Sequence, residues 1–367
     1  MRHWCTLSVL FSMLFSACDD VSTEGVEQTL ESQAWSGWDD LGRHLFYDRR
    51  LSIHDNRSCG ICHEQAKGFT DGFVRAVGST EEIHPRNTLT LINVSNRTSL
   101  GWITVEPEHL EAQMLTPLLG TTPVEMGLDE LLSTRLDELN EDRVYQRLIA
   151  ALNLRRLTLE ELTFAIASFQ RQITSYKSPY DHYLAGQNEA LSASAQRGLT
   201  LFSDVLNCHQ CHGGRDFDQP NERILPDAES DIEVPRHGWF NTGLYNLGDG
   251  RYPQGREGLF EITGEHDDIG KYRVPTLRNL AFTGPYYHDG TGASLDDVLR
   301  DYNEGGRVTR SGPYIGDGRR HPNKHPLIKT LGLTADELAD LKAFLLSLTD
   351  EYIVKDPRLS DPWERAP

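Results

Sequence analysis

The sequence predicts a mainly α-helical protein that contains two copies of one module, with long loops such as 213–258 and 303–326. Three segments occur twice and in the same order: Gly-x-x-Leu-Phe, then Cys-x-x-Cys-His, then Leu-Thr-x-x-Glu-Leu. The two copies lie at 42–46 and 198–202, at 59–63 and 208–212, and at 157–162 and 333–338. A fixed order of matching segments indicates an internal duplication. Sequence signals for strands are weak.

The composition excludes several classes of protein. The chain has 367 residues, with 36 lysines and arginines against 55 aspartates and glutamates, so its formal net charge is −19. A chain this acidic lacks the basic stripe of a nucleic-acid-binding protein. Hydrophobic residues make up 38% of the chain, which is too many for a disordered protein. No apolar run reaches the roughly 18–20 residues of a transmembrane helix, so we expect no membrane span.

The N-terminus is typical of an export signal, which we assign to residues 1–18. Arg2 precedes an apolar stretch, and two small residues, Ser16 and Ala17, stand directly before Cys18. A cysteine at that place resembles a bacterial lipobox, which predicts a lipid anchor on Cys18. The alternative is an ordinary signal peptide that is cleaved nearby. The polar residues 19–36 would then form a tether, and we expect a periplasmic protein attached to a membrane as a lipoprotein.

Residues 37–185 form the first predicted module. Leu45 and Phe46 follow Gly42 by one helical turn, which predicts a helix before the first cysteine motif. Thr158 and Glu161 have the spacing of a capping box, which predicts the start of a second helix. Apolar residues then recur at helical spacing, at Leu162, Ala165, Ile166, Phe169 and Ile173.

Residues 186–352 form the second predicted module, and the boundary with the first lies within 178–192. Thr334 and Glu337 repeat the capping box. Apolar residues again follow at helical spacing, at Leu338, Leu341, Phe344, Leu345 and Leu348. Residues 353–367 are left as a C-terminal tail.

The Cys-x-x-Cys-His motifs predict covalent haem attachment. The spacing puts two thiols where they can form thioethers to the haem vinyl groups, and the next residue, His63 or His212, then lies under the iron as its proximal ligand. A redox dithiol needs no adjacent histidine, and a zinc site needs four ligands in one place. We therefore expect two covalently bound haem c groups, on Cys59, Cys62 and His63 and on Cys208, Cys211 and His212. Each module is then a class I c-type cytochrome domain.

The second axial ligand of each haem decides between electron transfer and chemistry. The chain has four methionines, at positions 1, 13, 114 and 126. No methionine follows residue 126, so the second module cannot supply a His/Met pair of its own. Spacing leaves several candidates open for its haem, namely the tyrosines and His237, His266, His288, His321 and His325.

Several segments resemble the bacterial di-haem cytochrome c peroxidase and MauG superfamily across nearly the whole mature chain. These segments are 41–48, 86–87, 110–113, 123–127, 274–279 and 285–290. In the electron-transfer peroxidases a methionine fourteen residues after the histidine of Tyr-His-Asp-Gly ligates the second haem. That position is Tyr302 here, as in MauG-type enzymes, so the resemblance implies His/Tyr ligation of this iron. An anionic tyrosinate stabilises ferric and higher-valent iron.

The resemblance also assigns residues to the peroxide-binding face of the first haem. Gln113 and Glu125 match the glutamine and glutamate of that face, and Pro117 matches a proline beside them. The glutamate would move a proton between the two peroxide oxygens. The insertion 119–122 makes the spacing from Gln113 to Glu125 two residues longer than the resemblance implies. The histidine that blocks this face in inactive peroxidases is replaced by Ser79, and His84 is nearby but out of register.

Two further assignments follow from the same resemblance. Trp102 resembles a tryptophan between the haems that carries electron exchange, although it is one residue out of register. Asn87, Thr283 and Pro285 match positions that hold a calcium ion between the domains, and calcium prefers such oxygen ligands.

The resemblance implies a MauG-like enzyme of the MbnH branch. Hydrogen peroxide would produce a state with both irons as Fe(IV), which oxidises a tryptophan of a partner, an exported MbnP-like copper-binding protein, to kynurenine. Leu206 replaces the surface tryptophan with which MauG oxidises methylamine dehydrogenase, so that reaction is not expected. Two alternatives remain: a cytochrome c peroxidase that reduces peroxide with electrons from a small donor, and a non-enzymatic electron carrier.

Overall fold

The computed structural model describes residues 37–97, 99–104, 109–220 and 238–364. The predicted signal at 1–18 and tether at 19–36 lie outside the described residues. Among the described helices, none is both long and apolar enough to span a bilayer.

The described chain is mostly helical with little sheet, as predicted. The helices of its first half are α2 (Gly37–Tyr47), α3 (Cys59–Cys62), α4 (Leu110–Gln113), α5 (Leu115–Leu119), α6 (Leu132–Glu141), α7 (Arg143–Ala151) and α8 (Leu159–Arg171). Those of the second half are α9 (Pro179–Leu184), α10 (Ala193–Thr200), α11 (Phe260–Thr263), α12 (Leu295–Asn303) and α13 (Ala335–Leu346). Two antiparallel pairs of two-residue strands join β1 (Trp239–Phe240) to β2 (Tyr272–Arg273) and β3 (Val308–Thr309) to β4 (Gly316–Asp317).

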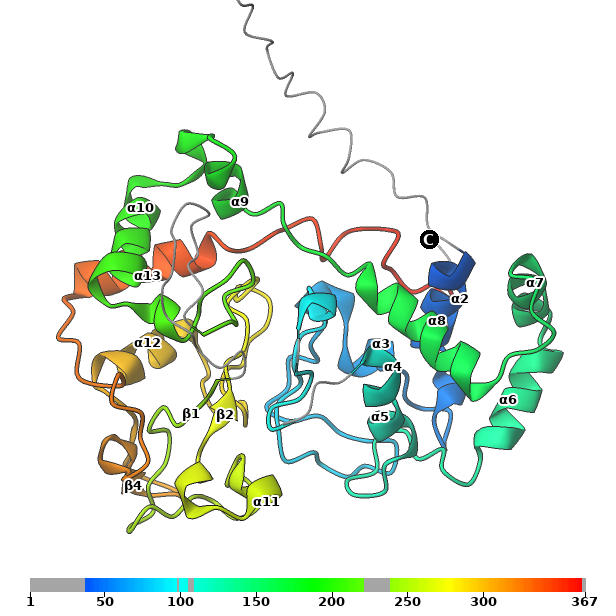
Figure 1. Cartoon of the computed structure of the whole chain (residues 1–367), viewed down its shortest axis with the longest axis horizontal. Coiled ribbons are helices and arrows are strands. Elements are labelled where there is room, and N and C mark those ends of the chain that lie inside the picture. The colour runs from blue at the N-terminus through cyan, green and yellow to red at the C-terminus, as the bar shows by residue number, and fades with distance from the viewer. Residues whose placement is uncertain (1–36, 98, 105–108, 221–237, 365–367) are drawn as a thin grey trace, which may run out of the picture. The chain divides into compact units, whose positions relative to one another are not determined.

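The two halves contain the same helix pair. Helix α2 packs on α8 in one half, and α10 packs on α13 in the other (Figure 1). A Cβ atom at Gly42 would lie 1.8 Å from the backbone oxygen of Ala165, and one at Gly198 would lie 2.0 Å from that of Asp340. Only glycine permits so close a crossing of two helices. The recurring glycine of the sequence therefore marks a helix contact that is present twice.

The two halves also have matching phenylalanine pairs in their hydrophobic cores, one helical turn after the glycine contacts. The rings of Phe46 and Phe169 lie 5.0 Å apart with planes inclined at 56°, and those of Phe202 and Phe344 lie 5.2 Å apart at 55°. All four rings are buried. Both predicted capping boxes are present, at Thr158 and Glu161 and at Thr334 and Glu337. The apolar periodicity of these helices thus predicted their buried faces.

Two segments pack differently from our expectation. Tyr180 of α9, which we assigned to the first module, is buried in the core of the second half. The C-terminal residues are more than a tail, because they run from α13 to α2 (Figure 1). The Tyr47 hydroxyl donates to the Leu359 carbonyl oxygen at 2.6 Å, and Arg43 Nε donates to that of Ser360 at 2.6 Å. Leu359 is 2% exposed, so burial of this side chain holds the segment in place.

Two candidate haem cavities

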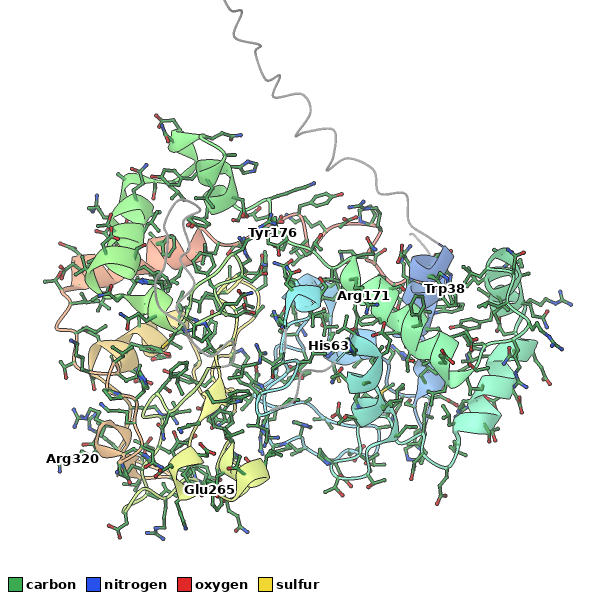
Figure 2. All side chains as sticks on the ribbon, viewed as in Figure 1. Trp38, His63, Arg171, Tyr176, Glu265 and Arg320 are labelled. Atoms are coloured by element: carbon green, nitrogen blue, oxygen red, sulfur yellow. The ribbon has the colours of Figure 1, made fainter. Side chains whose placement is uncertain are left out.

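The first cysteine motif lies in a cavity of about 290 Å³ in the first half, the N-terminal cavity. Helix α3 is a single turn from Cys59 to Cys62, and the backbone N–H of His63 donates to the Cys59 carbonyl oxygen at 2.8 Å. His63 Nδ1 lies 3.0 Å from the carbonyl oxygen of Phe69, and burial lowers the pKa of His63. The imidazole is therefore neutral, and a proton on Nδ1 leaves the Nε2 lone pair for a metal. Figure 2 shows His63 in the interior, next to α3.

The second motif has the same arrangement in a cavity of about 270 Å³, the C-terminal cavity. The His212 N–H donates to the Cys208 carbonyl oxygen at 2.8 Å, and His212 Nδ1 lies 3.1 Å from the carbonyl oxygen of Phe217. Burial lowers the pKa of His212 to about 4. In each cavity the histidine of the cysteine motif is thus neutral with its Nε2 available, as a proximal iron ligand requires.

The four thiols fit thioether bonds to haem better than a disulfide or a metal ion. All four cysteines are unpaired. Burial raises the pKa of Cys59, Cys62 and Cys208 to about 12 and that of Cys211 to about 11, so they are protonated. Across the described ranges, no group of three or more histidine, cysteine, aspartate or glutamate side chains is arranged to hold a metal ion.

Two buried arginines fit the carboxylates of a haem. Arg97 lines both cavities, and Arg273 lines the C-terminal one. Arg97 Nε lies 3.3 Å from Asp218, while Arg273 Nη2 is buried without a hydrogen-bond partner. Burial and the charge of Arg97 lower the pKa of Arg273 to about 10. Two guanidinium groups facing one carboxylate leave positive charge at the cavity walls, which suits the haem propionates.

Tyr302 lies in the C-terminal cavity with the second cysteine motif. Leu295, Leu299 and Tyr302 lie on one face of helix α12, because they are four and three residues apart. The two leucines are buried in the core, so this face of α12, with Tyr302, is turned toward the cavity. Burial raises the pKa of Tyr302, and the nearby thiols of Cys211 and Cys208 raise it further. Tyr302 is therefore close to the haem-attachment site, as the resemblance implied.

The histidines that spacing left open divide into three groups. His288 and His325 also line the C-terminal cavity. His321 is buried elsewhere, with Nε2 2.9 Å from the Gly250 carbonyl oxygen, and His266 begins a short turn at 266–268. His237 lies outside the described residues. Met114 and Met126, the methionines within the described residues, line the N-terminal cavity.

The residues predicted for peroxide chemistry meet in the N-terminal cavity. Gln113 of α4, Pro117 of α5 and Glu125 line it together with His63. The insertion 119–122 begins at the last residue of α5 and leads into a turn in which Thr121 pairs with Val124, so the longer spacing still returns Glu125 to the cavity. Burial raises the pKa of Glu125.

His84 is a cavity residue that sequence reasoning did not identify as a partner of Glu125. Its Nε2 lies 3.7 Å from Glu125 Oε1. Ser79, at the position of the blocking histidine, instead donates its backbone N–H to the Glu125 carbonyl oxygen at 2.7 Å. A bridge between Val77 and Ile83 brings His84 back toward the cavity. Only the three-dimensional path of this loop gives the contact.

Trp102 lines both cavities, as expected of a residue between two haems. Its indole Nε1–H donates to the Asn87 carbonyl oxygen at 2.8 Å, which fixes the ring. The rings of Tyr272 and His288 stand 6.4 and 6.5 Å away. These two rings stack on each other with centroids 3.6 Å apart.

The three residues predicted to bind calcium come together at the wall of the C-terminal cavity. Asn87, Thr283 and Pro285 all line it. The backbone N–H of Asn87 donates to the His288 carbonyl oxygen at 2.7 Å, and its Nδ2 donates to that of Phe73 at 2.8 Å. The side-chain oxygen Oδ1 is not used in either bond, so it is available to a cation. The calcium ion itself stays a prediction.

Comparisons with known proteins agree with this geometry. The sequence signature of the family "Di-haem cytochrome c peroxidase" matches residues 38–189. The chain is 34% identical to a cytochrome-c peroxidase of Denitromonas iodatirespirans over 88% of this chain and 85% of that one. It is 29% identical to the methylamine utilization protein MauG of Methylorubrum extorquens over 85% and 78%. A solved MauG-like protein associated with microbial copper homeostasis is 42% identical, with a TM-score of 0.83 over 90% of this chain and 94% of that one.

Proposed function

Because the chain belongs to the di-haem cytochrome c peroxidase family, which includes MauG, and is a haem-dependent peroxidase-type oxidoreductase, we propose that it oxidises a tryptophan of a partner protein with hydrogen peroxide. The partner is an exported copper-binding protein, and its tryptophan becomes kynurenine in a four-electron oxidation that consumes two hydrogen peroxides and releases formate and water. The observation that carries the proposal is Tyr302 in the C-terminal cavity, in a half of the chain that has no methionine. The 42% identity to a MauG-like protein of copper homeostasis supports the choice of partner.

The haem ligands follow from the two cavities. Cys59 and Cys62 would hold one haem, with His63 to bind its iron. Cys208 and Cys211 would hold the other, with His212 and Tyr302 to bind its iron. When bound, the two haems supply the redox chemistry, since together they can accept the two oxidising equivalents of one peroxide. The two halves then act as tandem class I c-type cytochrome domains, and the matched helix pairs support that assignment.

The peroxide reaction takes place in the N-terminal cavity. The Glu125 carboxylate accepts a proton from the nearer peroxide oxygen and returns it to the farther one, which leaves as water. Gln113 orients the oxygen species, and Pro117 limits the space around it. Partial burial of Glu125 raises its pKa, which favours the transient protonated form that this transfer needs.

Electron exchange between the two halves uses Trp102, whose ring reaches both cavities. A calcium ion held by Asn87, Thr283 and Pro285 would help to keep Trp102 in place, since the Asn87 carbonyl oxygen accepts the Trp102 indole N–H and the Asn87 backbone N–H donates to the His288 carbonyl oxygen. The proposed location is the periplasm, with a lipid anchor on Cys18.

One alternative has an observation in its favour. The curated relative with 34% identity is named a cytochrome-c peroxidase, which implies electrons from a small donor protein rather than oxidation of a tryptophan. That reaction stores a reducing electron on the second haem, for which a neutral thioether ligand is suited. The lack of any methionine after residue 126 favours the first proposal.

The test uses the full holoenzyme, hydrogen peroxide and a copper-binding protein encoded beside its gene. Mass spectrometry should detect kynurenine in one partner peptide with the wild type and none with Tyr302→His. Tyr352→Phe, at an exposed tyrosine outside the cavities, is the matched control and should retain the product. If Tyr302→His still forms kynurenine, the tyrosine is structural. Rapid oxidation of a small cytochrome with no kynurenine would support the alternative.

A further inference from the structure

A group of buried tyrosines extends from Trp102 toward the surface of the second half. Tyr272 stands 6.4 Å from the Trp102 ring and belongs to a buried cluster with Tyr252 and Tyr245. The Tyr252 and Tyr245 rings are 5.5 Å apart, and Tyr245 is 5.7 Å from Tyr314. The first three tyrosines are at most 7% exposed, whereas Tyr314 is half-buried.

The chain of rings ends in a hollow on the molecular surface, the hairpin hollow. Its walls are Tyr245, Thr291, Arg307, Thr309, Pro313 and Tyr314, and it encloses about 320 Å³. The hairpin of β3 and β4 forms one side of it. The innermost wall is therefore the ring of Tyr245, which a molecule seated in the hollow would touch.

Tyr245 has a built-in acceptor for its phenolic proton. Its hydroxyl donates to Asp289 Oδ2 at 2.6 Å, and Asp289 is fully buried. Burial alone would raise the pKa of Asp289, but the neighbouring His288 and the hydrogen bonds from Tyr245 and Thr291 hold that pKa below its usual range. Burial and the same aspartate raise the pKa of Tyr245. The resting pair is thus a neutral phenol and a carboxylate, which is the arrangement that lets a tyrosine lose an electron and a proton together.

The hairpin segment that forms one side of the hollow carries a net positive charge, opposite to that of the whole chain. Residues 307–320 hold four arginines and one aspartate, a net charge of +3 in a chain of net charge −19. Arg310 is exposed at the tip of the hairpin, and Figure 2 shows Arg320 at the periphery of the second half. Ile315, next to Tyr314, is 60% exposed. A partner with acidic side chains around an apolar or aromatic one would complement this surface.

We propose that oxidising equivalents leave the haem pair through Trp102, Tyr272, Tyr252 and Tyr245 to the hairpin hollow, where an acidic partner protein presents its oxidisable aromatic side chain. The inference rests on the proposed function, and it names the exit and the docking surface.

The electrons and protons of this route balance. Tyr245 gives one electron inward along the rings and its phenolic proton to Asp289, which leaves a neutral tyrosyl radical. The partner's aromatic side chain then gives one electron to that radical, and Asp289 returns the proton to the phenol. Two such transfers supply the two electrons, and the partner's oxidised side chain releases to solvent the two protons, with which one hydrogen peroxide becomes two waters. Formation of one kynurenine takes this sequence twice. Tyr314, between Tyr245 and solvent, lies on the same path at the edge of the hollow.

The route is tested by locating radicals. The holoenzyme is treated with hydrogen peroxide and a nitroso spin trap without any partner, and adducts are mapped by mass spectrometry. We expect adducts on Tyr245 and Tyr314 in the wild type and loss of the Tyr314 adduct in Tyr245→Phe. Tyr352→Phe is the matched control and should leave the Tyr314 adduct unchanged. An equal Tyr314 adduct in Tyr245→Phe would overturn the route. If Tyr245→Phe does not fold, Tyr314→Phe is used instead, since its position is only half-buried. This variant should lose the adduct at position 314 and keep the adduct on Tyr245.

The docking surface is tested by binding. The probe is a synthetic peptide in which aspartates and glutamates flank one tryptophan. Arg310→Glu should weaken its binding to the holoenzyme, and added salt should do the same. Arg155→Glu removes an exposed arginine of the first half and should leave binding unchanged. If the peptide binds Arg310→Glu as tightly as Arg155→Glu, the proposal of an acidic partner is wrong. It is also wrong if the peptide does not bind and a small neutral donor reduces the radical.

The two proposals fail in different ways. If Tyr245→Phe still forms kynurenine in the partner at the wild-type rate while Tyr302→His does not, the route is wrong and the proposed function stands. If the wild type traps radicals on Tyr314 but forms no kynurenine in any partner, the proposed function is wrong and the route stands.

Discussion

The Glu125 carboxylate lies 3.7 Å from Nε2 of His84 at the wall of the N-terminal cavity. His84 Nδ1 lies 3.1 Å from the backbone nitrogen of Arg86 and 3.3 Å from the Arg86 carbonyl oxygen, and these two contacts hold the ring beside Glu125. Burial lowers the pKa of His84 and raises that of Glu125. Both shifts favour the neutral forms, which are an imidazole with one proton and a protonated carboxyl group. Glu125 therefore keeps a proton to a higher pH than an exposed glutamate does.

Glu125→Gln should slow peroxide cleavage by about 10²- to 10⁴-fold, because an amide cannot accept the proton. Both haems should stay attached. In the wild type the cleavage rate should rise with pH as Glu125 becomes a carboxylate, and burial places that rise above the usual range of a glutamate. Stopped-flow absorbance across pH measures both effects. Glu130→Gln, at an exposed position, is the control and should behave as the wild type; an unchanged rate in Glu125→Gln would exclude it as the base.

His84→Leu should shift the same pH dependence upward. The polar imidazole of His84, with Nε2 3.7 Å from Glu125 Oε1, stabilises the charged carboxylate more than a leucine side chain can, so its removal raises the pKa of Glu125 further, by up to about one pH unit. The rate on the high-pH plateau should change little, since His84 itself transfers no proton to peroxide. The pH profile of cleavage is the measurement. A profile identical to that of the wild type would show that the two side chains do not interact.

Replacement of each cysteine pair should remove one haem. Cys59→Ala with Cys62→Ala should leave only the haem of the C-terminal cavity, and Cys208→Ala with Cys211→Ala should leave only the other. Thioether bonds survive denaturation, so haem stain after denaturing electrophoresis measures the stoichiometry. Extraction of haem from the wild type by acid would contradict covalent attachment.

Local spacing explains why much of the fold could be predicted. The two capping boxes depend on residues within one helical turn, and the glycines at positions 42 and 198 stand out because they recur in the same place of a repeat. The approach of Tyr302 to His212 spans ninety residues, so spacing left it open and only the family resemblance singled it out. The contact of His84 with Glu125 and the tyrosine route to the hairpin hollow depend on how loops fold over one another, and no periodic pattern in the sequence encodes these paths.

Gly42→Ala and Gly198→Ala should each destabilise the protein by about 3 kcal/mol, the upper end of the cost of overpacking. The added methyl group would meet the backbone of α8 or α13, which cannot rotate away as a side chain can. Thermal unfolding of the holoprotein measures the loss. Thr200→Ala, at an exposed position of α10, is the control and should stay within about 0.5 kcal/mol of the wild type. Equal stability of the glycine variants would mean that the helix crossings are looser than the structure shows.

Leu359→Ala should loosen the C-terminal segment from the first half. Leu359 is 2% exposed, and truncation of a buried leucine costs about 2–5 kcal/mol. Its backbone oxygen accepts the Tyr47 hydroxyl, and Gln65 Nε2 donates to the carbonyl oxygens of Ile353 and Asp356 at 3.0 and 2.8 Å. Gln65 follows His63 closely, so release of the segment should speed hydrogen exchange around the first haem motif as well as at α2. Leu184→Ala, at a leucine that is 38% exposed, is the control and should leave exchange at both places unchanged. If exchange in Leu359→Ala increases only within residues 353–364, the segment covers the first half without supporting its haem site.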